Sequence, residues 1–194
     1  MNELNNNSFY TVEELNLIGF KRIGNNVLIS RNAKFYNPQK MIIGNNVRID
    51  DFCILSGSVE LGNYIHIAAF CALFGGEFGI KMCDFSGLSS RVSIYAMTDD
   101  YLTDCLTNPT VPMEYRNVIG AKVVIEKHVI VGASSIILPG VTLKEGSSFG
   151  TLSLINKDSI EWSVNVGIPS KYLKDRQRGA LMLEKKLTKE KKQK

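Results

Sequence analysis

Aliphatic residues recur every sixth position along much of this chain. Ile or Leu stands at each of positions 43, 49, 55, 61, 67 and 73, and a Met, a Leu and an Ile stand at 82, 88 and 94. After a gap the register returns at 125, 131, 137, 143, 149 and 155. A period of six fits neither an α-helix nor a plain alternating strand, but it fits a short strand and a turn repeated many times. The pattern therefore predicts short strands joined by tight corners.

Three such units close a coil of eighteen residues with a triangular cross-section, and successive coils stack about 4.8 Å apart. The aliphatic residue of each unit points inward, and small residues such as the glycines of IGNN at 43 and VGAS at 131 suit the corners. Cys53 and Cys71 are eighteen positions apart and are expected to stack on one inner face. We expect them, like Cys83 and Cys105, to be reduced and to behave as small apolar side chains.

The rhythm stops between Ile94 and Ile125. Residues 94–120 read IYAMTDDYLTDCLTNPTVPMEYRNVIG, which is polar and contains Pro109 and Pro112. The chain is thus expected to leave the prism as a loop over about residues 99–121. Excursions longer than about fifteen residues in a compact domain are usually functional.

Both ends of the repeat carry different patterns. In TVEELNLIGF, Thr11 and Glu14 form a predicted capping box for a short helix that ends near Gly19. The segment beyond Pro169 is expected to be helical. The predicted organisation is a helical cap over residues 1–22, an all-β domain of parallel strands over 23–168 and a basic helix or tail over 169–194.

The charge adds one feature to this picture. The chain has 194 residues, 44% of them hydrophobic, and a net charge of +4. Residues 171–194 hold ten Lys or Arg against three acidic residues, so the positive charge is concentrated in this tail. The tail is either a solvated terminus or a contact for a phosphorylated ligand. With no signal-like start and no long apolar run, a cytoplasmic protein without membrane insertion is expected.

The hexads, the internal loop and the ending NVGIPSKYL resemble the hexapeptide-repeat acyltransferases. The phrases NYIHIAAFCALFGG, DFSGLSSRVSIY and TNPTVP are most similar to the galactoside and xenobiotic acetyltransferase branch, especially to acetyltransferases of O-antigen and capsule clusters such as those acting on dTDP-4-amino-4,6-dideoxyglucose. The resemblance implies a left-handed β-helix, a homotrimer, acetyl-CoA as co-substrate and a sugar acceptor, with no metal.

The same resemblance implies a cofactor path marked by small residues. It places Gly132, Ala133, Gly150 and Thr151 along the pantetheine, although ordinary repeat corners would look the same. It places Ile168 and Pro169 over the adenine. The basic residues implied near the CoA phosphates, which need charge-assisted donors, are Lys157, Lys171, Lys174 and Arg178.

In the galactoside branch the loop's first turn carries a histidine base, and this chain has Asp99 and Asp100 there instead. Its two histidines are His128, expected to be a solvated corner residue, and His66, which is either an active-site or a surface residue. A sugar hydroxyl needs a base near neutrality, whereas an amine needs a group that orients it and takes a proton. We therefore expect N-acetylation over O-acetylation, with His66, Asp99 and Asp100 as catalytic candidates; the alternative for the two aspartates is capping of the loop's first turn.

Other classes of function fit less well. A zinc site of three histidines is excluded because the chain has two. A nucleic-acid-binding protein would carry its positive charge on a folded face with interleaved aromatics. A structural or interaction β-helix remains an alternative, but it gives no reason for the loop or for the basic ending.

Overall fold

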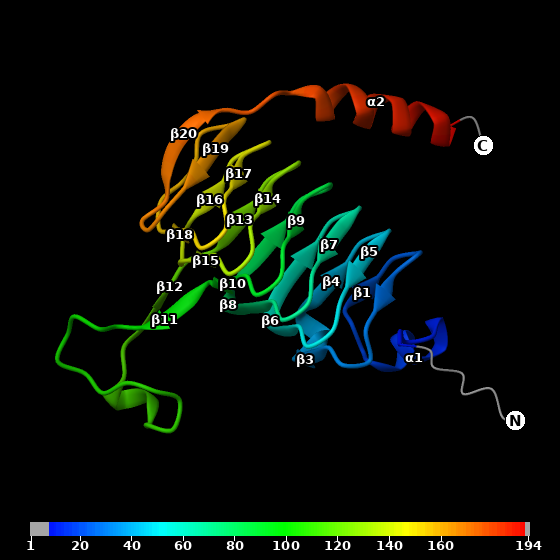
Figure 1. Cartoon of the computed structure of the whole chain (residues 1–194). Coiled ribbons are helices and arrows are strands. Elements are labelled where there is room, and N and C mark those ends of the chain that lie inside the picture. The colour runs from blue at the N-terminus through cyan, green and yellow to red at the C-terminus, as the bar shows by residue number, and fades with distance from the viewer. Residues whose placement is uncertain (1–7, 193–194) are drawn as a thin grey trace, which may run out of the picture.

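Short strands on three faces build the molecule into a left-handed parallel β-helix of about seven turns (Figure 1). The computed structural model describes residues 8–192. The predicted fold class is confirmed, and the six-residue period is its physical cause: each hexad supplies one short strand and one corner. No helix within residues 8–192 is long and apolar enough to cross a membrane.

The strands fall on three faces that repeat in the same order along the chain. The first face holds β1 (Arg22–Ile23), β4 (Met41–Ile43), β13 (Val123–Ile125) and β16 (Thr142–Leu143). The second holds β2 (Leu28–Ile29), β5 (Val47–Ile49), β7 (Ile65–Ile67), β9 (Gly87–Leu88), β14 (Ile130–Val131), β17 (Ser148–Phe149) and β19 (Ser163–Val166). The third holds β3 (Lys34–Tyr36), β10 (Ser93–Tyr95), β15 (Ile136–Ile137) and β18 (Leu154–Ile155).

Two long strands join the third face to the first. β6 (Ile54–Leu61) and β8 (Ala72–Met82) run through the corner between them, so both faces belong to one ten-stranded sheet. The second face forms an eight-stranded sheet with β20 (Lys171–Asp175) at its end. Strands of neighbouring coils pair in parallel, as when Arg48 lies opposite His66. Outward residues of the same hexad position therefore line up along the axis.

The core is the inside of the prism. Every aliphatic position of the predicted six-residue register is buried, and the most exposed, Phe149, reaches 5%. Cys53 and Cys71 are also fully buried and free, and their thiols donate to the carbonyls of Ala68 at 3.2 Å and Ser89 at 3.1 Å. The inward-pointing prediction is therefore confirmed for the hexads and for both cysteines.

The predicted loop leaves the prism two residues earlier than expected. β11 (Met97–Asp99) and β12 (Val118–Gly120) form an antiparallel ribbon at its base, and residues 100–117 project away from the prism in Figure 1. The short 3₁₀ helix η2 (Met113–Tyr115) lies within the loop, whereas η1 (Pro38–Lys40) lies in an early coil. The ribbon fixes the start and end of the loop, so its base is an ordered part of the structure.

The two ends differ in how well the sequence predicts them. Helix α1 (Val12–Leu17) begins after Thr11, and the reciprocal capping box of Thr11 and Glu14 is present. The C-terminal helix expected beyond Pro169 is present as α2 (Gly179–Lys192), but it begins later than predicted, because β20 first pairs antiparallel with β19. The physical reason is the exposed edge of β19, whose backbone groups need hydrogen-bond partners.

Candidate active site

One corner of the prism stacks a regular column of residues. It joins the second face to the third, and backbone amides there bond to the next coil: Asp50 to Ile67, Ala68 to Leu88, Ser89 to Val131, Gly132 to Phe149 and Gly150 to Asn165, at 2.8–3.0 Å. We call Asp50, Ala68, Ser89, Gly132 and Gly150 the corner ladder. A Cβ on Gly132 would lie 2.6 Å from the Thr151 nitrogen, so glycine is required there by the close coil spacing.

The four small residues expected along the cofactor lie together at this corner. Ala133 and Thr151 follow the two glycines, and the Leu152 amide bonds to the Ala133 carbonyl at 2.9 Å. Side chains this small leave the backbone of these coils open to a ligand. The structure thus unites the predicted pantetheine residues on one corner.

The basic ending reaches the same corner from the last coil. Ser170 donates its amide to Leu154 at 2.7 Å, and Leu154 donates to Gly167 at 3.1 Å, so the exposed Ile168 and Pro169 lie next to the end of the ladder. Lys171 and Lys174 follow on β20, both exposed. The expected adenine and phosphate contacts therefore neighbour the expected pantetheine path.

Two predicted phosphate contacts lie elsewhere in the chain. Lys157 follows β18, on the far side of the third face from the ladder. Arg178 lies over the Trp162 ring at 5.9 Å, at the corner between the first and second faces. Within one chain these two side chains are not part of the corner ladder.

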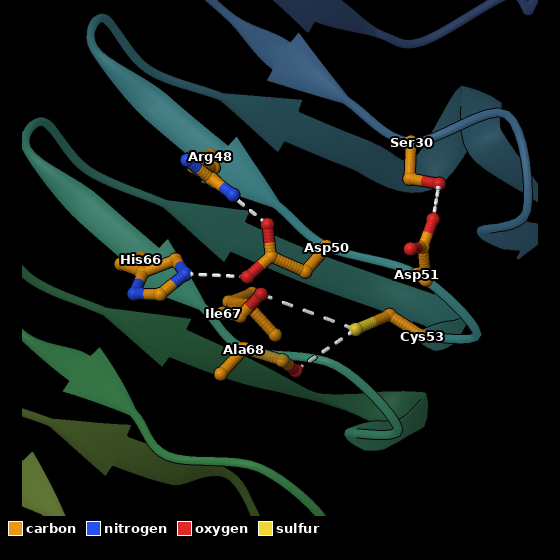
Figure 2. A network of polar contacts seen from close by, with 8 residues as sticks. All are labelled: Ser30, Arg48, Asp50, Asp51, Cys53, His66, Ile67 and Ala68. Atoms are coloured by element: carbon orange, nitrogen blue, oxygen red, sulfur yellow. Dashed lines mark hydrogen bonds and ion pairs between the residues drawn. The ribbon is translucent and has the colours of Figure 1, made fainter. Parts of the chain in front are cut away.

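His66 belongs to a polar network on the second face (Figure 2). Its Nε2 lies 2.7 Å from one oxygen of Asp50, and Arg48 Nε donates to the other oxygen at 2.7 Å. Partial burial alone would raise the pKa of Asp50, but the hydrogen bonds from Arg48 and His66 outweigh it and lower that pKa. His66 is half exposed and lies opposite Gly87, two positions before Ser89. It is thus held by the carboxylate of Asp50, the first member of the ladder.

Asp99 stands at the end of β11, where the loop begins. One carboxylate oxygen accepts from Arg116 Nη2 at 3.2 Å, and the other accepts from the Asn108 amide at 3.0 Å. The Arg116 side chain is only 10% exposed, and its Nε has no hydrogen-bond partner among the described residues. This carboxylate is held in place and still partly open to solvent.

Asp100, the next residue, is buried and committed to the loop. One oxygen accepts from the Leu102 amide at 2.9 Å, and the other accepts from Thr103 Oγ1 at 2.9 Å and Asn117 Nδ2 at 2.7 Å. The hydrogen bond from Leu102, followed by that from Thr103, lowers the pKa of Asp100. The capping alternative describes Asp100, whereas Asp99 remains available to a ligand.

The sequence predicts His128 as a solvated corner residue, but the structure shows it buried. It is 7% exposed, stacks on Phe85 at 5.4 Å and lies beside the tilted Trp162 ring at 5.9 Å. Its Nε2 lies 2.8 Å from Glu184 of α2. The prediction failed because Trp162 and α2, distant in sequence, cover this corner. His128 therefore belongs to the packing of α2 against the prism.

Ser89 is the candidate that the sequence reasoning missed. It occupies the same corner position as Gly132 and Gly150, directly after an inward aliphatic residue, but carries a hydroxyl. The hexad register contained this signal, since LS at 88 aligns with VG at 131 and FG at 149. A polar side chain thus stands where the small-residue path meets the coil that leads into the loop.

Known proteins resemble this chain over nearly its whole length, although no family model matches it. It is 44% identical to a dTDP-4-amino-4,6-dideoxy-D-glucose acyltransferase of Escherichia coli, over 88% of this chain and 90% of that protein. It is 25% identical to WbbJ of Escherichia coli K12, named for lipopolysaccharide biosynthesis O-acetyl transfer, over 81% and 89%.

A solved structure agrees closely in shape. AntD, an N-acyltransferase of Bacillus cereus in complex with dTDP and 3-hydroxybutyryl-CoA, is 50% identical, with a TM-score of 0.93 over 96% of this chain and 99% of that one. An AntD variant was also solved with dTDP-4-amino-4,6-dideoxyglucose and coenzyme A. The chain therefore belongs to the hexapeptide-repeat acyltransferases, in the group that includes the dTDP-4-amino-4,6-dideoxy-D-glucose acyltransferases.

Proposed function

We propose that this acyltransferase moves an acyl group from acyl-CoA to the amine of a nucleotide-linked amino sugar. The names of its relatives support dTDP-4-amino-4,6-dideoxyglucose as the acceptor. Two donors should be compared: acetyl-CoA, which the sequence resemblance implies, and 3-hydroxybutyryl-CoA, with which AntD was solved. The single observation that carries the proposal is the Asp99 carboxylate, which is held and partly open at the base of the loop.

The spacing of Ser89 and Asp99 supports this site. AntD structures include variants altered at a serine and at an aspartate ten positions further along its chain. Here Ser89 and Asp99 have that spacing, and so do Ser90 and Asp100. Asp100 is buried and fully engaged within the loop, so Ser89 and Asp99 fit substrate contact better. They stand on opposite sides of the third face, so we propose that they meet one substrate across adjoining chains.

The chemistry follows from an amine acceptor. The ammonium binds the Asp99 carboxylate and loses a proton, for which His66 of an adjoining chain is the candidate acceptor. The neutral nitrogen then attacks the thioester carbonyl carbon, the carbon–sulfur bond breaks, and the departing thiolate takes up the second proton of the nitrogen. An amine is nucleophilic once neutral, so the step needs no strong base.

The donor is proposed to lie along the C-terminal half of the corner ladder. Gly132, Ala133, Gly150 and Thr151 would flank the pantetheine, and Ile168, Pro169, Lys171 and Lys174 would meet the nucleotide end. Lys157 and Arg178 lie at other corners, so we propose that CoA reaches them only across an adjoining chain of a homotrimer.

A second candidate is O-acetylation of a sugar in lipopolysaccharide synthesis, favoured by the similarity to WbbJ. We place the reaction in the cytoplasm and propose that its product serves O-antigen or capsule assembly in either case. Asp99 in place of a histidine base favours the amine.

Release of CoA, detected through its thiol, tests the proposal directly. With dTDP-4-amino-4,6-dideoxyglucose we expect turnover and a product heavier by one acyl group in mass spectrometry. Turnover with hydroxyl acceptors alone would replace N-acylation by O-acetylation. No turnover together with no CoA binding would favour a structural β-helix.

A further inference from the structure

Two exposed phenylalanines stack on each other beside the corner ladder. The Phe52 and Phe70 rings lie 5.0 Å apart at an interplanar angle of 24°, and the residues are 52% and 56% exposed. Both have positive φ, at +59° and +64°, a conformation that bulky residues rarely adopt. Two large apolar rings are therefore held outward at adjacent corners, where they gain little from the core.

The backbone register places this stack relative to the reacting groups. Phe70 donates its amide to Asp51 at 2.9 Å, and Arg91 donates to Ala69 at 3.1 Å, so Phe52, Phe70 and Arg91 occupy successive coils. Ser89 shares the corner of Arg91. The rings thus lie one and two coils from Ser89, on the side opposite Gly132 and Gly150. Two coils span about 10 Å, a distance that a sugar with its diphosphate can bridge.

The charges at this corner fit an anionic ligand with a flat base. Arg91 is exposed, and its Nε donates to Ser134 Oγ at 3.1 Å, which holds the guanidinium at the corner. The carboxylates of Asp50 and Asp51 lie nearby, but hydrogen bonds to Arg48 and Ser30 engage them. Arg91 is therefore a cation on the coil of Ser89, next to the aromatic stack.

We propose that Phe52 and Phe70 form the platform on which the nucleoside base of the acceptor stacks, with Arg91 beside its diphosphate. This assignment rests on the proposed function, because it requires a nucleotide-linked acceptor whose sugar reaches Ser89 and the Asp99 of an adjoining chain. Donor and acceptor would then enter the same corner from opposite ends. Aromatic rings stack on any base, so the platform supplies affinity without selecting the base. Arg91, by binding the diphosphate, sets the orientation of the nucleotide.

The test compares Phe70→Ala and Phe52→Ala with the wild-type chain in two assays. Titration with free dTDP reads the platform without turnover, and steady-state kinetics give KM for acceptor and acyl-CoA separately. We expect dTDP affinity to fall and the acceptor KM to rise at least about fivefold, with an unchanged KM for acyl-CoA. Phe70→Tyr should restore most of the affinity. Tyr36→Ala, which removes an exposed ring from β3, should change neither value.

Equal dTDP affinity and equal acceptor KM in both alanine variants would overturn the platform. Light scattering that shows loss of subunit association in these variants would also overturn it, because the rings would then be a contact between copies. Failure of the proposed function reads differently: the wild-type chain would bind dTDP through the stack and yet release no CoA with an amino sugar.

Discussion

Asp99 and Asp100 are neighbours with opposite environments. The Asp99 carboxylate is held by Arg116 and the Asn108 amide and remains partly exposed, whereas Asp100 is buried and accepts three hydrogen bonds from the loop. The chemistry of the acceptor is therefore assigned to one residue of the pair, and the shape of the loop to the other.

Replacement of Asp99 should impair catalysis more than folding. We expect Asp99→Asn to lower kcat/KM for the amino sugar by at least about 100-fold, because the amide binds an ammonium weakly and accepts no proton. The KM for acyl-CoA should stay unchanged. Steady-state CoA release measures both, and circular dichroism checks the fold. If Asp99→Asn and His66→Ala each keep the wild-type rate, both residues are misassigned.

Replacement of Asp100 should act on the loop. In Asp100→Ala the Leu102 amide, Thr103 and Asn117 lose their acceptor, so limited proteolysis should cut residues 101–116 several-fold faster than in the wild-type chain. Asp104→Ala, a change of the same kind at an exposed loop position, is the matched control and should leave the cleavage rate unchanged. Equal cleavage rates in the Asp100→Ala and wild-type chains would contradict the capping role.

The sequence predicts the start of the loop as a functional segment, but it does not show which of its residues are buried and which are exposed. It placed Asp99 and Asp100 together at the loop's start, because adjacency in sequence says nothing about which carboxylate is buried. It predicted His128 as solvated, because the covering groups, Trp162 and Glu184, come from later coils and from α2. Local pattern identifies corners, whereas tertiary contacts decide which corners are open.

The strands and corners as elements follow the six-residue rule closely. Every predicted inward position is buried, because each hexad must turn one aliphatic residue into the prism. β20 escaped prediction for a related reason: all five of its residues are exposed, so KYLKD carries no inward signal. Its pairing with β19 depends on an available sheet edge, which the local sequence does not show.

The corner ladder makes a prediction about glycine. A methyl group at position 132 would lie 2.6 Å from the Thr151 nitrogen, so Gly132→Ala must push two coils apart. We expect a loss of about 1–3 kcal/mol in the free energy of unfolding and a higher KM for acyl-CoA. Chemical denaturation and steady-state kinetics measure the two effects.

Gly87→Ala is the matched control for Gly132→Ala. The nearest atom to its added methyl group is a side-chain carbon of Ile130 at 3.4 Å, an ordinary contact. We expect this change to cost less than about 0.5 kcal/mol in the free energy of unfolding. Equal losses for the two variants would contradict the close-packed ladder.

Helix α2 is tied to the prism by a carboxylate, which makes its docking depend on pH. Glu184 contacts Lys127 at 2.5 Å and His128 at 2.8 Å, and the hydrogen bond from Lys127, the larger effect, lowers the pKa of Glu184 below its ordinary value of 4.5. A carboxyl with a lowered pKa stabilises docking fully above pH 4.5 and loses that contribution as the pH falls through the lowered value.

The single tryptophan, Trp162, reports this docking because it contacts the His128 ring and lies under Arg178. We expect Glu184→Gln to change the fluorescence of Trp162 at neutral pH in the same way that acid changes it in the wild-type chain. The free energy of α2 docking should fall by about 0.5 kcal/mol, because the ion pair lies close to solvent. Glu190→Gln is the control on an exposed turn of the same helix. An identical fluorescence titration in the Glu184→Gln and wild-type chains would exclude a role of the Glu184 carboxylate in docking α2.

At the scale of the whole molecule, one corner collects the proposed chemistry. Small residues mark its C-terminal half, Ser89 stands at its middle, and Phe52 and Phe70 mark its N-terminal half. Asp99 lies across the third face, where the loop leaves the prism after β10. Lys171 and Lys174 lie at the end where the CoA phosphates are proposed, whereas α2 docks on Lys127 and His128 at another corner. A linear prism thus allows two long substrates to meet end to end.

The central claim is that the acceptor group is an amine, and a matched acceptor pair tests it most directly. The measurement is kcat/KM for CoA release with dTDP-4-amino-4,6-dideoxyglucose and with the same nucleotide sugar carrying a hydroxyl at the fourth carbon. We predict that kcat/KM is at least about 100-fold higher with the amine, because an ammonium pairs with the Asp99 carboxylate and a neutral hydroxyl cannot. Equal values, or a preference for the hydroxyl, would contradict the claim.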